Sequence, residues 1–149
     1  MKEYAIVLTD EGQLYGWGIN ASYQLGLDSN GFRGQIFVPQ PIQINTTGIS
    51  GRIVQVAATQ YYVIVLTDEN QLYTWGSASL HPVPMNTSMF NGEEIVEIVA
   101  GMSHVMARTS GGKLYGFGYN SFGQIGNGAR YNNDPNFVAV NMTAMQGKK

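Results

Sequence analysis

Residues 8–18 read Leu-Thr-Asp-Glu-Gly-Gln-Leu-Tyr-Gly-Trp-Gly, and the chain repeats this motif twice more. Residues 66–76 read Leu-Thr-Asp-Glu-Asn-Gln-Leu-Tyr-Thr-Trp-Gly, and residues 108–118 read Arg-Thr-Ser-Gly-Gly-Lys-Leu-Tyr-Gly-Phe-Gly. The leucine that precedes the tyrosine recurs after 58 and then after 42 residues. Self-similarity with a period of about 50 residues is typical of stacked supersecondary units, none of which buries its apolar face alone. The sequence therefore predicts an array of three repeats.

Each copy of the motif has the pattern of a β-hairpin. Two apolar runs flank a four-residue segment that has Asp or Ser early and Gly or Asn at its end. This composition suits a type I turn closed by a residue in the left-handed conformation, so we expect turns at residues 9–12, 67–70 and 109–112. Antiparallel sheet fits the pattern and a helix does not. The strands that we expect are residues 4–8, 13–17, 53–58, 62–66, 71–75, 95–100, 104–108 and 113–117.

The composition agrees with an all-β chain and narrows the class of partner. Charged residues make up only 12% of the 149 residues, whereas there are 19 glycines, and this favours strands and tight turns. The net charge of -2 gives no basic footprint for a polyanion, so we expect no nucleic-acid partner. The length is that of one domain.

Several kinds of site and location are disfavoured by what the sequence lacks. There is no cysteine, which excludes disulfides, thiolate catalysis and cysteine-rich metal sites. No segment approaches the roughly 20 apolar residues of a membrane helix, so we expect no membrane partner. No signal-peptide core precedes the first repeat, and an intracellular location is therefore favoured.

Two acidic pairs, Asp10 with Glu11 and Asp68 with Glu69, could suggest acid–base catalysis. Both pairs fall at matching hairpin tips, where acidic residues form turns and remain solvated. The third copy has Ser110 and Gly111 instead, which an essential pair in every unit would not tolerate. We therefore expect these residues to form turns, and we expect no catalytic residue in the chain.

The motif ends on an aromatic ring with a glycine after it and, in two copies, a glycine before it. Such a ring can wedge between packed layers while glycine lets backbones approach closely. We therefore expect Trp17, Trp75 and Phe117 to occupy equivalent buried positions between neighbouring sheets. A dinucleotide-binding loop at residues 116–118 is excluded, because Ser121 stands where the third glycine would be and no crossover helix follows. No cofactor is expected.

Four Asn-x-Ser/Thr sequons occur, at Asn20, Asn45, Asn86 and Asn141. We interpret them as chance occurrences in a chain that is rich in Asn, Ser and Thr. Glycosylation would require secretion, for which the chain shows no signal.

A second motif follows the hairpin in two copies: residues 20–26, Asn-Ala-Ser-Tyr-Gln-Leu-Gly, align with residues 120–126, Asn-Ser-Phe-Gly-Gln-Ile-Gly. With the Ile-Val-x-Val-Ala-Ala segment and a Gly-x-x-His, this combination resembles the regulator of chromosome condensation repeat family. The third copy matches it best, and in the second copy Thr59 and Tyr62 replace the Gly and the His.

The resemblance implies an all-β fold, a β-propeller built from blades of four-stranded antiparallel sheet. Three repeats, at about 1–58, 59–100 and 101–149, supply only about three blades, whereas propellers have typically 4–8. The propeller would therefore be incomplete in this chain. Either the chain is an excerpt of a longer protein, or several copies of it or a partner chain complete the stack.

The same resemblance makes His104 a structural polar residue at the start of an inner strand. His81 falls in the shortened second repeat, where we expect a loop. Two single histidines in different repeats, with no cysteine or acidic cluster, form no credible metal site.

Two insertions are the best candidates for partner binding. Residues 28–37 and 128–134 each place an arginine near an aromatic residue, a composition typical of binding hot spots. The alternative is that these rings cover the rim of the propeller. The candidate partner-binding residues are Phe32, Arg33, Phe37, Arg130 and Tyr131.

Two classes of function remain open. The first is a non-enzymatic scaffold whose loops bind another protein. The second, implied by the resemblance, is guanine-nucleotide exchange on a small GTPase, although no hairpin insertion outside the repeats is visible here. A plant ultraviolet-B photoreceptor is disfavoured, because the chain has only two tryptophans and lacks the Gly-Trp-Arg-His-Thr motif.

Overall fold

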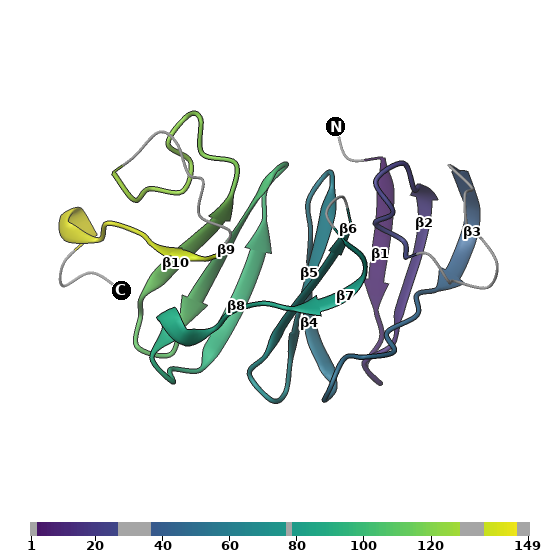
Figure 1. Cartoon of the computed structure of the whole chain (residues 1–149), viewed down its shortest axis with the longest axis horizontal. Coiled ribbons are helices and arrows are strands. Elements are labelled where there is room, and N and C mark those ends of the chain that lie inside the picture. The colour runs from purple at the N-terminus through teal and green to yellow at the C-terminus, as the bar shows by residue number, and fades with distance from the viewer. Residues whose placement is uncertain (1–2, 27–36, 77–78, 129–135, 146–149) are drawn as a thin grey trace. The chain divides into compact units, whose positions relative to one another are not determined.

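The structure is a computed structural model that describes residues 3–26, 37–76, 79–128 and 136–145 (Figure 1). Within these ranges the chain is all-β, with three antiparallel sheets and two short 3-10 helices. The chain divides into two compact units, Met1–Met85 with two sheets and Asn86–Lys149 with one. No described helix is long or apolar enough to span a membrane.

The sheets follow the repeats in chain order. The first contains β1 (Tyr4–Leu8), β2 (Leu14–Ile19) and β3 (Phe37–Gln43). The second contains β4 (Ile53–Ala58), β5 (Tyr62–Thr67), β6 (Leu72–Gly76) and β7 (Ser79–Pro84), in that spatial order. The third contains β8 (Ile95–Ala100), β9 (His104–Thr109), β10 (Leu114–Gly118) and β11 (Val138–Ala139). The 3-10 helices are η1 (Ser88–Phe90) and η2 (Thr143–Met145).

All eight expected strands are confirmed, with ends that differ by at most two residues. The last strand of each sheet, β3, β7 and β11, has no counterpart among the expected strands. Prolines interrupt the apolar patterns of β3 and β7, and β11 has only two residues. These strands lie at sheet edges, where a missing N–H is tolerated. His81 lies in β7, so our expectation of a loop there is wrong.

The three hairpin turns are also confirmed. In the first, the Thr9 N–H donates to the Gln13 carbonyl at 2.8 Å and the Gly12 N–H to the Thr9 carbonyl at 3.0 Å. The residue that closes each turn has a positive φ, +81° at Gly12, +60° at Asn70 and +78° at Gly112. The acidic pairs are exposed at the turns, as expected of turn-forming residues.

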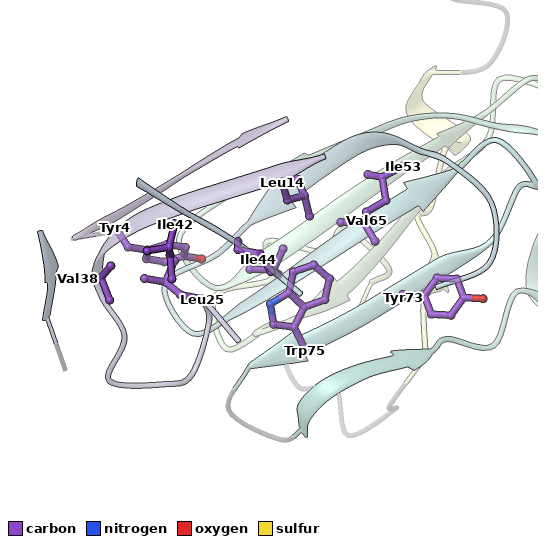
Figure 2. Close-up of a cluster of buried hydrophobic side chains, with 11 residues drawn as sticks. Tyr4, Leu14, Leu25, Val38, Ile42, Ile44, Ile53, Val65, Tyr73 and Trp75 are labelled. Atoms are coloured by element: carbon purple, nitrogen blue, oxygen red, sulfur yellow. The ribbon is translucent and has the colours of Figure 1, made fainter. Parts of the chain in front are cut away.

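The core of the first unit lies between its two sheets (Figure 2). Leu14 and Leu25 of the first repeat and Val65 and Trp75 of the second sheet belong to one buried cluster. The indole Nε1 of Trp75 donates to the Gln24 carbonyl at 2.9 Å, and the Tyr4 hydroxyl donates to the Thr59 carbonyl. The second unit has an aromatic core, in which Phe90, Tyr115, Phe117 and Phe137 pack with centroid distances of 4.7–5.7 Å.

The expectation for the three motif rings is correct for their register but only partly for their burial. Trp17, Trp75 and Phe117 pair with Ala5, Val63 and Val105 at equivalent positions of their hairpins. Trp75 is 2% exposed, whereas Trp17 and Phe117 are only half-buried. Burial of the ring depends on what covers that face of the sheet, which a repeat motif cannot specify.

Three of the four sequons turn out to be a structural repeat. In each, the asparagine Oδ1 accepts the backbone N–H two residues later, at 2.9 Å for Asn45 and Asn86 and 3.0 Å for Asn141. This is an Asx turn directly after the last strand of each sheet. Asn20 differs, because it is 4% exposed and its Oδ1 accepts the Leu25 N–H. These three asparagines therefore have a structural role in turns, and the interpretation of the Asn-x-Ser/Thr pattern as a chance occurrence stays a prediction.

Candidate interaction surface

The antiparallel hairpins give each sheet two distinct ends. The hairpin-tip end contains the turns that join the two strands of each motif hairpin, namely β1–β2, β5–β6 and β9–β10. The loop end contains residues 20–26 and 59–61 in the first unit and residues 101–103 and 119–128 in the second. Loops carried by a rigid sheet are the usual place for binding residues.

The second sequence motif forms a tightly bonded turn at the loop end. In residues 20–26, Asn20 Oδ1 accepts the Leu25 N–H at 2.9 Å and Gln24 Oε1 accepts the Ser22 N–H at 2.8 Å. The equivalent bonds in residues 120–126 measure 3.0 and 2.9 Å. The side chains of Asn and Gln thus satisfy the backbone of the turn from within, which fixes the residues between them.

One position of this turn requires a left-handed backbone. Gly123 fills it in the third repeat with φ +74°, and Tyr23 fills it in the first with φ +58°. A bulky residue with positive φ is an outlier that costs about 1 kcal/mol or more. The Tyr23 side chain is 40% exposed.

Exposed aromatic and methionine side chains gather at the loop end of each unit. In the first unit Tyr61 is 45% exposed, and the adjacent Gln60 carbonyl accepts the Gln24 Nε2–H at 3.2 Å, which ties this loop to the Tyr23 turn. In the second unit Phe122 is 82% exposed and packs edge-on against Tyr119 at 6.2 Å. We call these residues the loop-end surface of each unit: Tyr23, Phe37 and Tyr61 for the first unit, and, separately, Met102, Tyr119 and Phe122 for the second.

Charged residues gather at the opposite end. Of the eleven that the structure describes, only Glu3 lies toward the loop end. The other ten belong to the hairpin tips or to neighbouring strand ends, and seven of these are acidic: Asp10, Glu11, Asp68, Glu69, Glu93, Glu94 and Glu97, with Arg52, Arg108 and Lys113. Among the described residues, each sheet therefore has a charged, mainly acidic hairpin-tip end and a loop end with exposed aromatic side chains, at which Glu3 is the only charged residue.

At the hairpin-tip end, two neighbouring side chains bind the Glu93 carboxylate. The Thr109 hydroxyl donates to Glu93 Oε2 at 2.6 Å, and Lys113 Nζ lies 3.2 Å from Oε1. These contacts, the Thr109 bond first, hold the pKa of the Glu93 carboxyl below its ordinary value. Glu93, which precedes β8, is thus bound to the turn of the β9–β10 hairpin in its own sheet.

The structure describes only one of the five partner-binding residues that the sequence indicated, and their role in binding stays a prediction. Phe37 begins β3 opposite Ile19, is 69% exposed and lies at the loop end. Phe32, Arg33, Arg130 and Tyr131 lie outside the described residues. The sequence reasoning missed Tyr23, Tyr61, Met102, Tyr119 and Phe122, although Tyr23 and Phe122 interrupt a turn motif of small and polar residues.

The described residues contain no group of three or more His, Cys, Asp or Glu side chains placed to hold a metal ion. His104 is half-buried at the start of β9, where its carbonyl accepts the Gly101 N–H at 2.8 Å. His104 is thus the first residue of β9, and its backbone hydrogen bond closes the turn between β8 and β9.

Three antiparallel sheets with the same hairpin, two of them followed by the same closing turn, are typical of a β-propeller repeat protein. The model of the regulator of chromosome condensation (RCC1) repeat matches residues 11–66, and a second model of this repeat matches residues 95–124. The chain belongs to the regulator of chromosome condensation repeat family.

Relatives and solved structures agree with this assignment. The ultraviolet-B receptor UVR8 of Arabidopsis thaliana is 34% identical over 136 residues, which cover 85% of this chain and 30% of the receptor. Human protein RCC2 is 26% identical over 91% of this chain and 26% of its own length. Human WBSCR16 superimposes with a TM-score of 0.83 at 23% identity, and yeast Prp20p with 0.75 at 19%. These matches cover 94% and 97% of this chain but only 38% and 37% of the solved chains. The chain thus spans under two fifths of each of these proteins.

Proposed function

We propose that this chain is a non-enzymatic propeller module that binds a protein partner through its loop-end surface. The observation that carries the proposal is the placement of exposed rings on loops that side-chain hydrogen bonds hold rigid. Phe122 is 82% exposed, yet the turn beneath it is bonded through Asn120 and Gln124. A ring presented on a fixed backbone loses little conformational entropy on binding.

The chemistry of the loop-end surface suits a protein partner. Aromatic residues and methionine are enriched at the centres of protein interfaces, whereas Lys, Glu and Asp are depleted there. The described loop end has this composition, and the hairpin-tip end has the opposite one. The acidic character of the tips disfavours a polyanionic partner at that end as well.

The alternative is guanine-nucleotide exchange on a small GTPase, as a complete factor or as part of one. Its support comes from a solved relative, because the work on yeast Prp20p describes its binding to Gsp1p and histones. Prp20p is 19% identical in sequence to this chain, so the likeness shows a common fold and not a common activity. A nucleotide-release assay against a panel of small GTPases tests this alternative, and acceleration of release would support it.

A library of random displayed peptides provides a defined probe for the loop-end surface. Peptides selected on the wild-type chain should lose affinity at least about fivefold for Tyr61→Ser or Phe122→Ser, which is the effect of removing one hot-spot ring. The matched control is Val54→Ser, because Val54 is 43% exposed but lies near the hairpin-tip end of β4. Peptides that tolerate both loop-end changes would contradict the proposal.

We also propose that further repeats, from a longer chain or from other copies, complete the stack of sheets. Among the described residues the first sheet has three strands where the other two have four, and β1 lies at its edge. An unpaired edge strand is a site for association unless something covers it.

A further inference from the structure

Three of the four Asn-x-Ser/Thr sequons lie at the same place in the three sheets. Each follows the last strand of its sheet, whose end pairs with the motif tyrosine next to the hairpin tip through Gln43, Pro84 and Ala139. The asparagine and the hydroxyl residue two positions later are exposed in all three: Asn45 and Thr47, Asn86 and Ser88, and Asn141 and Thr143. These sequons are therefore accessible to solvent at the hairpin-tip end of each sheet.

The Asx turn brings together the two residues on which a sequon depends. In each turn the asparagine Oδ1 accepts the N–H of the hydroxyl residue itself, at 2.9 Å for Thr47 and Ser88 and 3.0 Å for Thr143. The amide Nδ2 is the atom that carries an N-linked glycan. In these three asparagines it makes no hydrogen bond to a described residue. The turn therefore uses the side-chain oxygen and leaves the nitrogen exposed.

The turn alone does not account for this choice of residues. An Asx turn uses a side-chain oxygen and a backbone N–H, so aspartate would serve in place of asparagine and any residue except proline in place of Ser or Thr. All three turns nevertheless have the amide and the hydroxyl, and none has proline between them. These two features are what an N-glycosylation acceptor needs and the turn does not.

The fourth sequon, at Asn20, provides an internal contrast. Asn20 is 4% exposed, and its Oδ1 accepts the Leu25 N–H at 2.9 Å. The N–H of its hydroxyl residue, Ser22, donates to Gln24 Oε1 instead. A glycan on Asn20 would require the turn at residues 20–26 to open, so this sequon is inaccessible in the folded chain.

We propose that Asn45, Asn86 and Asn141 are acceptor sites for N-linked glycans and that Asn20 of the folded chain is not. In the transfer, the bond between Nδ2 and C1 of the sugar forms as the bond between C1 and the diphosphate of a lipid-linked oligosaccharide breaks. The amide loses one proton and the lipid diphosphate leaves. This proposal is the alternative to the chance interpretation, and use of the sites requires passage through the secretory pathway, where this donor occurs.

The position of the three sites makes the inference independent of the proposed function. Glycans at the hairpin-tip end lie at the opposite end of each sheet from its loop-end surface. Peptides selected at the loop end should therefore bind the glycosylated and the deglycosylated chain equally well.

Secretion of the whole chain from yeast behind a cleavable signal peptide tests the sites. Removal of the glycans with peptide-N-glycosidase in heavy-oxygen water converts each occupied asparagine to a labelled aspartate, which mass spectrometry locates. We expect the label at Asn45, Asn86 and Asn141 of the secreted chain and none at Asn20. Absence of the label from the first three positions, or equal labelling of Asn20, would overturn the inference.

Two variants of the first site separate glycosylation from the turn. Asn45→Asp keeps the oxygen that accepts the Thr47 N–H, and Thr47→Ala keeps that N–H, so both should retain the turn. Each should lose the glycan at residue 45 and keep those at Asn86 and Asn141. A Thr47→Ala chain that is still glycosylated at Asn45 would show that the sequon is not what is recognised, and would also overturn the inference.

A soluble N-glycosyltransferase gives a second readout that does not depend on secretion. This enzyme transfers one hexose from a nucleotide sugar to the asparagine of a sequon, and the nucleoside diphosphate leaves. The folded chain from bacteria should accept hexose at Asn45, Asn86 and Asn141, whereas Asn20 should accept it only in peptides from a protease digest. A folded chain that accepts none at the three sites, while its digest does, would contradict the proposal and leave the loop-end interaction untouched.

Discussion

Trp75→Ala and Trp17→Ala make the same chemical change at equivalent positions in two sheets, and we predict different losses of stability. Truncating a buried tryptophan to alanine costs about 3–5 kcal/mol through lost burial and the cavity that remains. Trp75 is 2% exposed, so the whole of this cost applies. Its loss also leaves the Gln24 carbonyl without the indole donor, for a further cost of about 1–3 kcal/mol.

Trp17 is more exposed than Trp75, so its truncation should cost less than the full burial term of about 3–5 kcal/mol. This is less than the repeat motif alone implied, because the motif predicts equal burial for both rings. Trp75→Phe keeps a buried aromatic ring but removes the N–H donor and part of the indole volume, so its loss of stability sets an upper limit on the cost of the missing hydrogen bond.

Hydrogen exchange of the Val63 and Val65 amides, measured at low protein concentration, reports the opening free energy of the first unit. These two residues are fully buried, so their exchange follows the larger openings of the unit. Exchange is preferable to a single melting curve, because a chain of two compact units need not unfold in one step. Equal losses for Trp75→Ala and Trp17→Ala would refute the reasoning that the neighbouring sheet, and not the motif, determines burial.

Three further predictions concern the turns. Tyr23→Gly should raise the free energy of unfolding by about 1 kcal/mol in urea, because it removes a bulky residue from a left-handed position. Asn86→Ala should lower it by about 1 kcal/mol through loss of the Asx turn, and Asn20→Ala should lower it more, since it leaves the buried Leu25 N–H without its acceptor. The pKa of Glu93 is lower in the folded than in the unfolded chain, so ionised Glu93 adds to the free energy of unfolding. This contribution is fully present above the unfolded pKa and is lost as the pH falls through the folded pKa. Glu93→Gln should therefore flatten the acid side of the stability profile of the second unit, and an unchanged profile would contradict this.

The hairpins could be predicted from sequence because their determinants are local. Type I turns need Asp or Ser early and a left-handed residue at the end, and both signals lie within four residues. Gly12, Asn70 and Gly112 all show the positive φ that the sequence implied. The division into repeats at about 1–58, 59–100 and 101–149 stays a prediction.

Features that depend on distant neighbours were missed. The strands β3 and β7 contain prolines and are held by pairing to β2 and β6, so their own sequence gives little sign of them. The turn-forming role of three sequon asparagines was missed, because an Asx turn uses the asparagine and a backbone N–H and does not need the Ser or Thr at the third position. Of the residues of the loop-end surface, the sequence indicated only Phe37, because hot-spot composition points to insertions and not to single rings within short turns.

The turn at residues 20–26 relates stability to the proposed interaction role. Its backbone bonds match those of residues 120–126, so a glycine at the left-handed position is sufficient to form the turn. Tyr23 adds no bond to this pattern; it adds backbone strain and a ring that is 40% exposed at the loop end. Strained residues are typical of functional sites, where a strained backbone is kept because it positions a side chain that the function needs. Tyr23→Gly should therefore make the chain more stable and also weaken its binding to loop-end peptides, and a variant that gained stability with unchanged binding would remove Tyr23 from the interaction surface.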